Sequence, residues 1–253
     1  MIDFHKKELF VFDLDGTLTP SKSRMEPDMG ELISRLLEQK RVAVISGGTF
    51  YQFQLDFINI LPGTAKSFSN LVILPTSGAR MMLWRGDWHE EYAEDLSQKD
   101  KRKILAALDQ TLKTVDFKVP EKTYGPTIED RGSQITFSAN GQKAPLEIKK
   151  VWDPTREKRE KIVAILGKLL PGFDSRVGGE NSVDVTRRGI NKAYGIHKLE
   201  QYLHIPIDKM LFVGDKLMLG GNDYAAKTTG VDCIQVSGPE ETKALIKGWI
   251  SAQ

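Results

Sequence analysis

The sequence predicts an α/β protein, a doubly wound parallel sheet with a smaller α+β domain inserted in its middle. Short apolar runs alternate with helical patterns over residues 1–80 and again over residues 188–253, as in parallel sheets covered by helices. Between them, residues 81–187 contain strands in which apolar and polar side chains alternate, which is typical of antiparallel sheets with one wet face. We therefore expect a core of residues 1–80 and 188–253 and an inserted domain of residues 81–187.

The first half of the core is expected to start with a buried strand, because the run from Leu9 to Phe12 is apolar without interruption. The next segment, residues 28–39, places its apolar side chains at helical spacing and predicts an amphipathic helix. The elements expected after it are a strand at 41–46, a helix at 49–58 and a strand at 71–74 that Pro75 ends.

The inserted domain is predicted from its alternating segments, which are residues 82–85, 133–138 and 181–185. Two helices fit between these strands, at residues 97–114 and 155–169. The core pattern then resumes with a helix at 191–202, a strand at 210–213, a helix at 222–227, a strand at 231–236 and a helix at 240–249.

Composition excludes several classes of partner. Lysine and arginine number 36 against 34 aspartate and glutamate residues, which gives no argument for nucleic acid or an anionic membrane surface. No apolar run approaches the ~18 residues that a membrane span requires. The single cysteine, Cys233, lies in an apolar run and is expected to be a buried, inert thiol. These features predict a cytoplasmic protein with neither a nucleic-acid nor a membrane partner.

The most informative segment follows the first strand, where Asp13 and Asp15 are separated by one residue. The carboxyl end of a parallel strand opens into the crevice where α/β sheets bind ligands. Two ionised carboxylates that close repel each other, and Mg²⁺ is the expected counter-charge. Gly16 permits a sharp turn, after which Thr17 offers a hydroxyl and an N–H to an anion. The alternative is a simple Asp-Gly turn.

Further polar residues follow later strands and complete a predicted phosphoryl-transfer site. Asp13 is the expected nucleophile and Asp15 the general acid and base. Ser46 and Gly47 are expected to bind phosphoryl oxygens, and Lys192 to neutralise the charge on them. The predicted Mg²⁺ ligands are Asp13, Asp15 through its carbonyl, Asp215 and Asp223, the last directly or through water.

These motifs together resemble the haloacid dehalogenase superfamily. The matching segments are FDLDGTLT, ISGG, RRGINKAYGI and VGDKLMLGGNDY, and the resemblance covers essentially the full chain. It implies a Rossmann-like core with an inserted cap of the Cof type, as in subfamily IIB. Within that subfamily the chain resembles eukaryote-type phosphomannomutases, because GDK is followed by GGNDY.

The resemblance to phosphomannomutases also implies substrate-binding residues in the cap. Ser182 and Asp184 match positions that contact sugar hydroxyls, and Arg131 matches an arginine that grips a distal phosphate. Lys149 falls near the place of another cap arginine. Gln142 stands in the segment where those mutases carry a further arginine, so the expected second phosphate clamp is weakened.

We therefore expect a Mg²⁺-dependent phosphohydrolase that acts on a small phosphorylated sugar through an aspartyl phosphate. Two alternatives stay open, a phosphomannomutase and a non-catalytic phosphosugar-binding protein. A receiver domain of the response-regulator kind is disfavoured, because Leu74-Pro75-Thr76 has no aspartate at the end of the third strand. The sequence is compatible with a monomer or with a homodimer formed through the cap.

Overall fold

A computed structural model describes residues 2–20, 23–62, 65–115, 117–118 and 120–251. The chain divides into two compact units. The first unit comprises Met1–Ala93 and Asn191–Gln253, and the second unit comprises Glu94–Ile190. Among the described residues, no helix is both long and apolar enough to cross a membrane.

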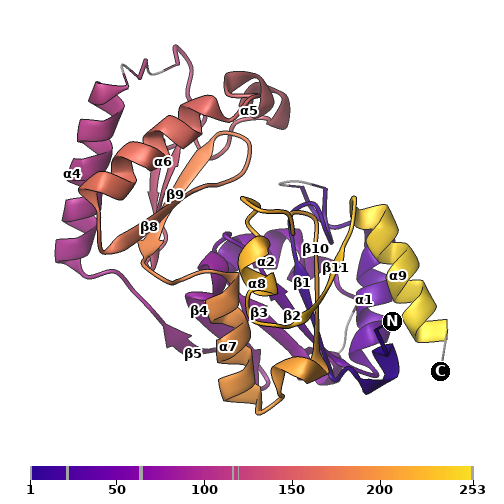
Figure 1. Cartoon of the computed structure of the whole chain (residues 1–253). Helices are drawn as coiled ribbons and strands as arrows, with labels where there is room; N and C mark the ends of the chain where they lie inside the picture. Colours follow the sequence, from indigo (N-terminus) through magenta and orange to yellow (C-terminus); the bar gives the residue numbers. More distant parts are fainter. Residues whose placement is uncertain (1, 21–22, 63–64, 116, 119, 252–253) are drawn as a thin grey trace. The chain divides into compact units, whose positions relative to one another are not determined.

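A seven-stranded sheet forms the centre of the first unit, in the order β11-β10-β1-β2-β3-β4-β5 (Figure 1). The first five strands in this order run parallel, and β4 and β5 are added antiparallel. The strands are β1 (Leu9–Asp13), β2 (Arg41–Ile45), β3 (Leu71–Leu74), β4 (Arg80–Trp84), β5 (Trp88–Ala93), β10 (Met210–Gly214) and β11 (Asp232–Gln235). The helices are α1 (Pro27–Leu37), α2 (Phe50–Asp56), α3 (Ala65–Phe68), α7 (Lys192–Leu203), α8 (Tyr224–Lys227) and α9 (Pro239–Ser251). The described residues of this unit also form the short 3₁₀ turns η1 (Phe4–Lys6), η2 (Ile58–Ile60), η3 (Thr76–Gly78) and η4 (Ile207–Lys209).

The side chains of β1 point alternately to the two faces of this sheet, and all of the apolar ones are covered by helices. Phe10 and Phe12 belong to a hydrophobic cluster with α1 and α9, two helices that Figure 1 shows side by side. Leu9 and Val11 belong to a second cluster, with α7 and α8. Successive side chains of a strand point to opposite faces, so a strand buried on both faces is apolar throughout.

The position of β1 in the sheet also marks the expected ligand crevice. β1 pairs with β2 on one side and with β10 on the other. The chain therefore runs from the carboxyl end of β1 to β2 on one side, and the later strand β10 lies on the opposite side of β1. Such a reversal of strand order is the place where open α/β sheets bind ligands.

The second unit is a four-stranded antiparallel sheet in the order β6-β7-β9-β8. Its strands are β6 (Ile128–Asp130), β7 (Gln134–Ser138), β8 (Phe173–Val177) and β9 (Ser182–Arg187), and its helices are α4 (Gln98–Thr114), α5 (Leu146–Trp152) and α6 (Glu157–Leu169). Ile135, Phe137, Val183 and Val185 pack against α4 and α6. The opposite face of β7 and β9 therefore carries the polar residues of their alternating pattern.

The predicted α/β class is confirmed, with a parallel-dominated sheet and a separate antiparallel sheet. The structure differs from the expectation at residues 81–93, which were expected in the inserted domain. This segment forms most of the β4–β5 hairpin and extends the seven-stranded sheet of the first unit. Half-polar alternation does indicate antiparallel pairing, but an edge hairpin of a parallel sheet has the same pattern. Helix α5 was not expected, and the helix predicted at 49–58 is divided into α2 and η2.

Candidate active site

Asp13 and Lys192 meet at the carboxyl end of β1. Asp13 follows the same alternation as Leu9 and Val11, so its side chain lies on the face that α7 covers. Lys192 is the first residue of α7, and its Nζ forms ion pairs with Asp13 and with Asp223. All three side chains are buried, with Asp13 only 2% exposed. The lysine thus bridges two carboxylates that would otherwise repel each other.

Burial and neighbouring charges act in opposite directions on the pKa values of Asp13 and Lys192. Burial raises the pKa of Asp13 well above its ordinary value, and the charge of Lys192 opposes that rise. Burial by itself lowers the pKa of Lys192, but the charges of Asp13 and Asp223 outweigh burial and raise the pKa above its usual range. Lys192 is therefore protonated at neutral pH and supplies a fixed positive charge beside Asp13.

The turn after β1 depends on a glycine. Gly16 has φ +88°, a conformation that residues with a Cβ rarely adopt. A Cβ at this position would also lie 2.5 Å from Oδ2 of Asp215. The tight turn leaves Thr17 Oγ1 to donate to Asp13 Oδ2 at 3.4 Å. Gly16 thus allows Asp215, which follows β10, to approach the first strand closely.

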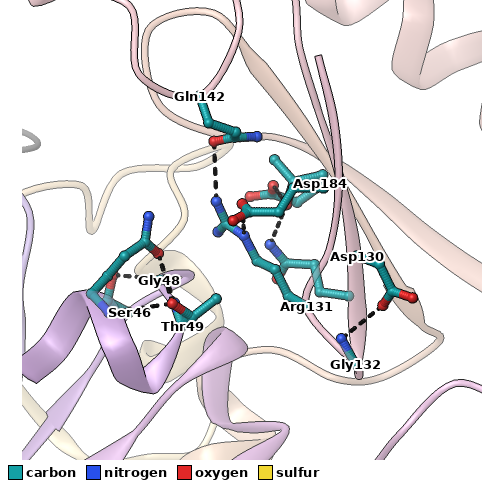
Figure 2. Close-up of polar contacts among 12 residues, drawn as sticks. Ser46, Gly48, Thr49, Asp130, Arg131, Gly132, Gln142 and Asp184 are labelled. Atoms are coloured by element: carbon teal, nitrogen blue, oxygen red, sulfur yellow. Dashed lines mark hydrogen bonds and ion pairs between the residues drawn. The ribbon is translucent and has the colours of Figure 1, made fainter. Parts of the chain in front are cut away.

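Asp15 is held by the turn that follows β2. Ser46 Oγ donates to Asp15 Oδ2 at 3.2 Å and accepts from the N–H of Gly48 at 3.3 Å. Thr49 then caps α2, and its Oγ1 accepts from the N–H of Gln52 at 3.3 Å. Figure 2 shows Ser46, Gly48 and Thr49 in this turn, and Gly47 lies between them in the sequence.

The acidic residues fit a hard divalent cation. Asp13, Asp215 and Asp223 each offer a carboxylate oxygen, and these oxygens lie within 4.8 Å of one another. Oδ1 of Asp215 is buried without a hydrogen-bond partner among the described residues, and burial raises the pKa of this group. Buried carboxylates that repel each other are stabilised by a cation, and Mg²⁺ prefers oxygen ligands.

Asp223 also fixes the loop between β10 and α8. Its Oδ2 accepts from the backbone N–H of Lys216 at 2.9 Å, while its Oδ1 pairs with Lys192. The motif indicated Asp223 as a metal ligand but did not indicate its contact with the lysine. No local signal could reveal that contact, because the two residues belong to different segments.

The predicted substrate-binding residues cluster within the second unit. Arg131 Nη2 donates to Gln142 Oε1 at 3.2 Å, which Figure 2 shows, and Lys149 Nζ donates to the backbone oxygen of Gln142 at 2.9 Å. Thr136 Oγ1 donates to Asp184 Oδ1 at 2.7 Å. Ser182 lies two residues before Asp184 on β9 and is buried.

Glu129 belongs to the same cluster, although it was not among the residues expected there. Arg131 Nε lies 2.6 Å from Glu129 Oε2 and forms an ion pair with it. The sequence signal for this contact was the spacing of two positions between Glu129 and Arg131, because residues so spaced on an extended segment share a face.

Comparison with known proteins identifies the family to which the chain belongs. The family model for haloacid dehalogenase-like hydrolases matches residues 10–225, so the chain belongs to this family, as the motifs indicated. Among individual proteins, the chain is similar to the phosphomannomutase of Galdieria sulphuraria, with 26% identity over 92% of this chain and 91% of that protein. The Saccharomyces cerevisiae phosphomannomutase is 26% identical over 85% of this chain and 83% of its own length.

Solved structures support the fold. IMP-bound, N-terminally truncated Plasmodium falciparum IMP-nucleotidase matches with a TM-score of 0.71 and 20% identity, over 98% of this chain and 68% of that one. Aspergillus fumigatus trehalose-6-phosphate phosphatase matches with a TM-score of 0.57 and 16% identity, over 100% of this chain and 98% of that one. At these identities the likeness concerns the fold alone.

Proposed function

We propose that this protein is a Mg²⁺-dependent phosphohydrolase that acts on a sugar phosphate through an aspartyl-phosphate intermediate on Asp13. The observation that carries the proposal is the buried ion-pair chain of Asp13, Lys192 and Asp223 at the carboxyl end of β1. A strand-end carboxylate beside a fixed cation is suited to attack a phosphate ester. The phosphorylated-sugar substrate and the cytoplasmic location are parts of the same proposal.

In the first step, the Asp13 carboxylate attacks phosphorus and the bond to the leaving sugar oxygen breaks. Lys192 neutralises charge that gathers on the transferring phosphoryl oxygens. Thr17, Ser46 and the N–H of Gly47 are proposed to bind the same oxygens. Asp13 is 2% exposed, so the proposal requires the segments around it to move when substrate binds.

Asp15 is proposed to move the protons. Its protonated form donates a proton to the leaving sugar oxygen, and the resulting carboxylate later takes a proton from the water that attacks the aspartyl phosphate, which restores the protonated form. Its hydrogen bond from Ser46 holds the carboxylate in the turn after β1. The products are the free sugar and inorganic phosphate.

The cation would be held by Asp13, Asp215 and Asp223 and by the backbone carbonyl of Asp15. When bound, Mg²⁺ neutralises negative charge on the carboxylates and the phosphate and orients the phosphoryl group. Asp223 has a second role in this proposal, because it positions Lys192 through their ion pair.

A phosphomannomutase is the second candidate, and the names of the relatives favour it. A mutase must hold a bisphosphate while the sugar turns round, so it needs a strong second phosphate site. The second unit offers Arg131 and Lys149 for this purpose, with Gln142 between them. A sugar-phosphate-binding protein without turnover is the third possibility. Whether the protein acts as a monomer or as a homodimer through the second unit stays a prediction.

One assay separates these functions. The protein is supplied with mannose 1-phosphate, Mg²⁺ and glucose 1,6-bisphosphate, and both inorganic phosphate and mannose 6-phosphate are measured. We expect inorganic phosphate, and we expect Asp13→Asn to lower its release by ~10³-fold or more. Mannose 6-phosphate as the main product would identify a mutase, and no product from mannose 1-phosphate or from any other hexose phosphate in the same assay would favour a binding protein. Asp232→Asn is the matched control, because Asp232 is half-exposed at the start of β11 and pairs with Lys7, outside the candidate site.

A further inference from the structure

Two consecutive residues in the turn after β3 have a backbone conformation that residues with a side chain rarely adopt. Thr76 has φ +49° and Ser77 has φ +60°, and Gly78 follows with φ +88°. We call residues 76–78 the Thr76 turn. Thr76 is β-branched, and a β-branched residue in the left-handed region is an outlier. Such a conformation persists only where the surrounding structure holds it, and it often marks a functional position.

The other non-glycine residues with positive φ in the described part of the chain, Arg156 and His204, lie next to helix ends. His204 caps the carboxyl end of α7 with φ +54° and ψ +32°, close to the φ +60° and ψ +32° of Ser77. A left-handed residue is common where a helix ends. The Thr76 turn follows a strand, so helix capping does not account for it.

In these conformations two N–H groups of the Thr76 turn point at the turn after β2. The N–H of Ser77 donates to the backbone oxygen of Ser46 at 2.8 Å, and the N–H of Thr76 donates to that of Gly48 at 2.9 Å. Ser46 donates its own N–H to the backbone oxygen of Leu74 at 3.3 Å. Both backbone groups of Ser46 are therefore held by the end of β3 and the turn that follows it.

Ser46 passes this constraint to the proposed acid and base. Its Oγ donates to Asp15 Oδ2 at 3.2 Å and accepts from the N–H of Gly48 at 3.3 Å. A hydroxyl group has one hydrogen to donate, so the position of the Ser46 backbone decides whether that hydrogen reaches Asp15. Asp15 is thus oriented through backbone groups that lie outside all four matching sequence segments.

Two further elements hold the Thr76 turn. A Cβ at Gly78 would lie 2.8 Å from the Cα of Gly195 on α7, the helix that begins with Lys192. The hydroxyl of Tyr92 on β5 donates to the backbone oxygen of Gly78 at 2.7 Å. The turn therefore packs between α7, β5 and the turn after β2, so a shift of this turn also moves Ser46.

We infer that Ser77 is a positioning residue of the active site, because its left-handed backbone holds Ser46 and Ser46 in turn orients Asp15. This inference rests on the proposed function, in which Asp15 protonates the leaving sugar oxygen. The role belongs to the backbone of Ser77 and is independent of its hydroxyl. Displacing the turn should therefore slow the reaction most for substrates whose leaving group needs a proton.

Two kinds of leaving group test the inference. A hexose 6-phosphate releases an alkoxide that must be protonated, whereas p-nitrophenolate is a weak base that departs without an acid. The kcat/KM for phosphate release is measured with p-nitrophenyl phosphate and with the faster of mannose 6-phosphate and glucose 6-phosphate. Valine disfavours positive φ, so we expect Ser77→Val to lower kcat/KM by about tenfold or more for the hexose phosphate and by less than about threefold for p-nitrophenyl phosphate.

Ser77→Gly is the rescue variant, and His204→Val is the matched control. Glycine lacks the hydroxyl but adopts positive φ without strain, so Ser77→Gly should restore both kcat/KM values to within about threefold of wild type. His204→Val places the same side chain at nearly the same φ and ψ, at the far end of α7 from Lys192. It should lower the urea midpoint as Ser77→Val does, and leave the ratio of the two kcat/KM values within about twofold of wild type.

Tyr92→Phe is used if Ser77→Val does not fold. It removes the hydrogen bond to Gly78 and leaves the backbone unchanged. We expect it to shift the ratio of the two kcat/KM values in the same direction by about threefold.

The outcomes distinguish the inference from the proposed function. An equal loss on both substrates in Ser77→Val, or an equally large loss in Ser77→Gly, would overturn the inference and leave the proposed function standing. The same holds for a shift of the ratio in His204→Val as large as in Ser77→Val, or for an unchanged ratio in Tyr92→Phe where Ser77→Val does not fold. No phosphate release from either hexose phosphate by the wild-type protein would remove the proposed function and the inference with it.

Discussion

At the scale of single residues, the geometry of the candidate active site depends on side chains and backbone that lie very close to one another. Asp215 and the turn after β1 are near enough that even one Cβ at position 16 would overlap a carboxylate oxygen. Lys192 forms ion pairs with both Asp13 and Asp223 and thereby holds the two carboxylates beside each other. The arrangement leaves little room for substitution, because each member positions another.

Gly16→Ala is expected to displace Asp215, since the new methyl group would lie 2.5 Å from its Oδ2. We predict that the Mg²⁺ concentration required for half-maximal phosphate release rises by ~10-fold or more. The measurement is a Mg²⁺ titration of activity. Gly86→Ala serves as the control, because Gly86 has the same φ of +88° and a Cβ added there would meet nothing within 4 Å. An equal change in both variants would show that backbone strain alone is responsible.

At the scale of secondary-structure elements, α6 illustrates how a helix start is fixed by a residue outside the helix. Its N-cap, Arg156, makes no side-chain cap. Asp153 instead accepts from the N–H groups of Lys158 and Arg159 and from Nε of Arg159. The Asp153–Arg159 pair is almost completely buried, so removing one partner leaves a charge without compensation.

Asp153→Asn is predicted to lower the free energy of unfolding by about 3 kcal/mol at pH 7. Burial favours the protonated form of Asp153, but its hydrogen bonds from Arg159 and the backbone outweigh burial and hold its pKa below the ordinary value of 3.8. The stability from a lowered pKa is present above 3.8 and is lost as pH falls through the folded-state pKa. The difference between variant and wild type should therefore shrink as pH is lowered from 5 toward 2.

Urea unfolding followed by circular dichroism measures this difference at each pH. Asp109→Asn is the control, because Asp109 and Lys113 form an exposed pair one helical turn apart on α4. We expect it to change stability by less than about 0.5 kcal/mol. A pH-independent deficit in Asp153→Asn would contradict the prediction.

At the scale of the whole molecule, each unit has its own hydrophobic core. Among the described residues, two clusters draw their members from the first unit, and a third draws its members from the second unit. The second unit is a single insertion between β5 and α7. Tyr92 and Tyr194, near the two ends of this insertion, have ring centroids 6.4 Å apart within the first unit.

Replacement of residues 94–190 by a short glycine and serine linker is therefore predicted to leave the first unit folded. The ends to be joined are already close, so the linker requires little closure entropy. Far-ultraviolet circular dichroism and urea unfolding should show one cooperative transition. We also expect Mg²⁺-dependent hydrolysis of p-nitrophenyl phosphate to persist, while preference among sugar phosphates is lost. Aggregation or a non-cooperative transition would show that the first unit depends on the second.

Much of the fold could be predicted from local patterns. The uninterrupted apolar run of β1 and the helical spacing in α1 depend on short stretches of chain, and both elements lie where the patterns place them. The strand at residues 82–85 was expected in the inserted domain, but it lies mostly in β4 of the seven-stranded sheet, because alternation indicates a wet face but not the neighbouring strand. Cys233 was expected to be buried, and it is half-buried, with burial raising the pKa of its thiol to about 11.

The sequence by itself determined which residues stand at the ends of strands and helices, because the period of a strand and the start of a helix are local properties. Asp13, Asp15, Ser46, Lys192 and Asp215 occupy such positions. Only the tertiary structure decided which of them touch. Lys192 and Asp13 are 179 residues apart, and Glu129 neutralises Arg131 through a contact that no motif contains. Charges separated in sequence interact strongly only when folding brings them together away from water.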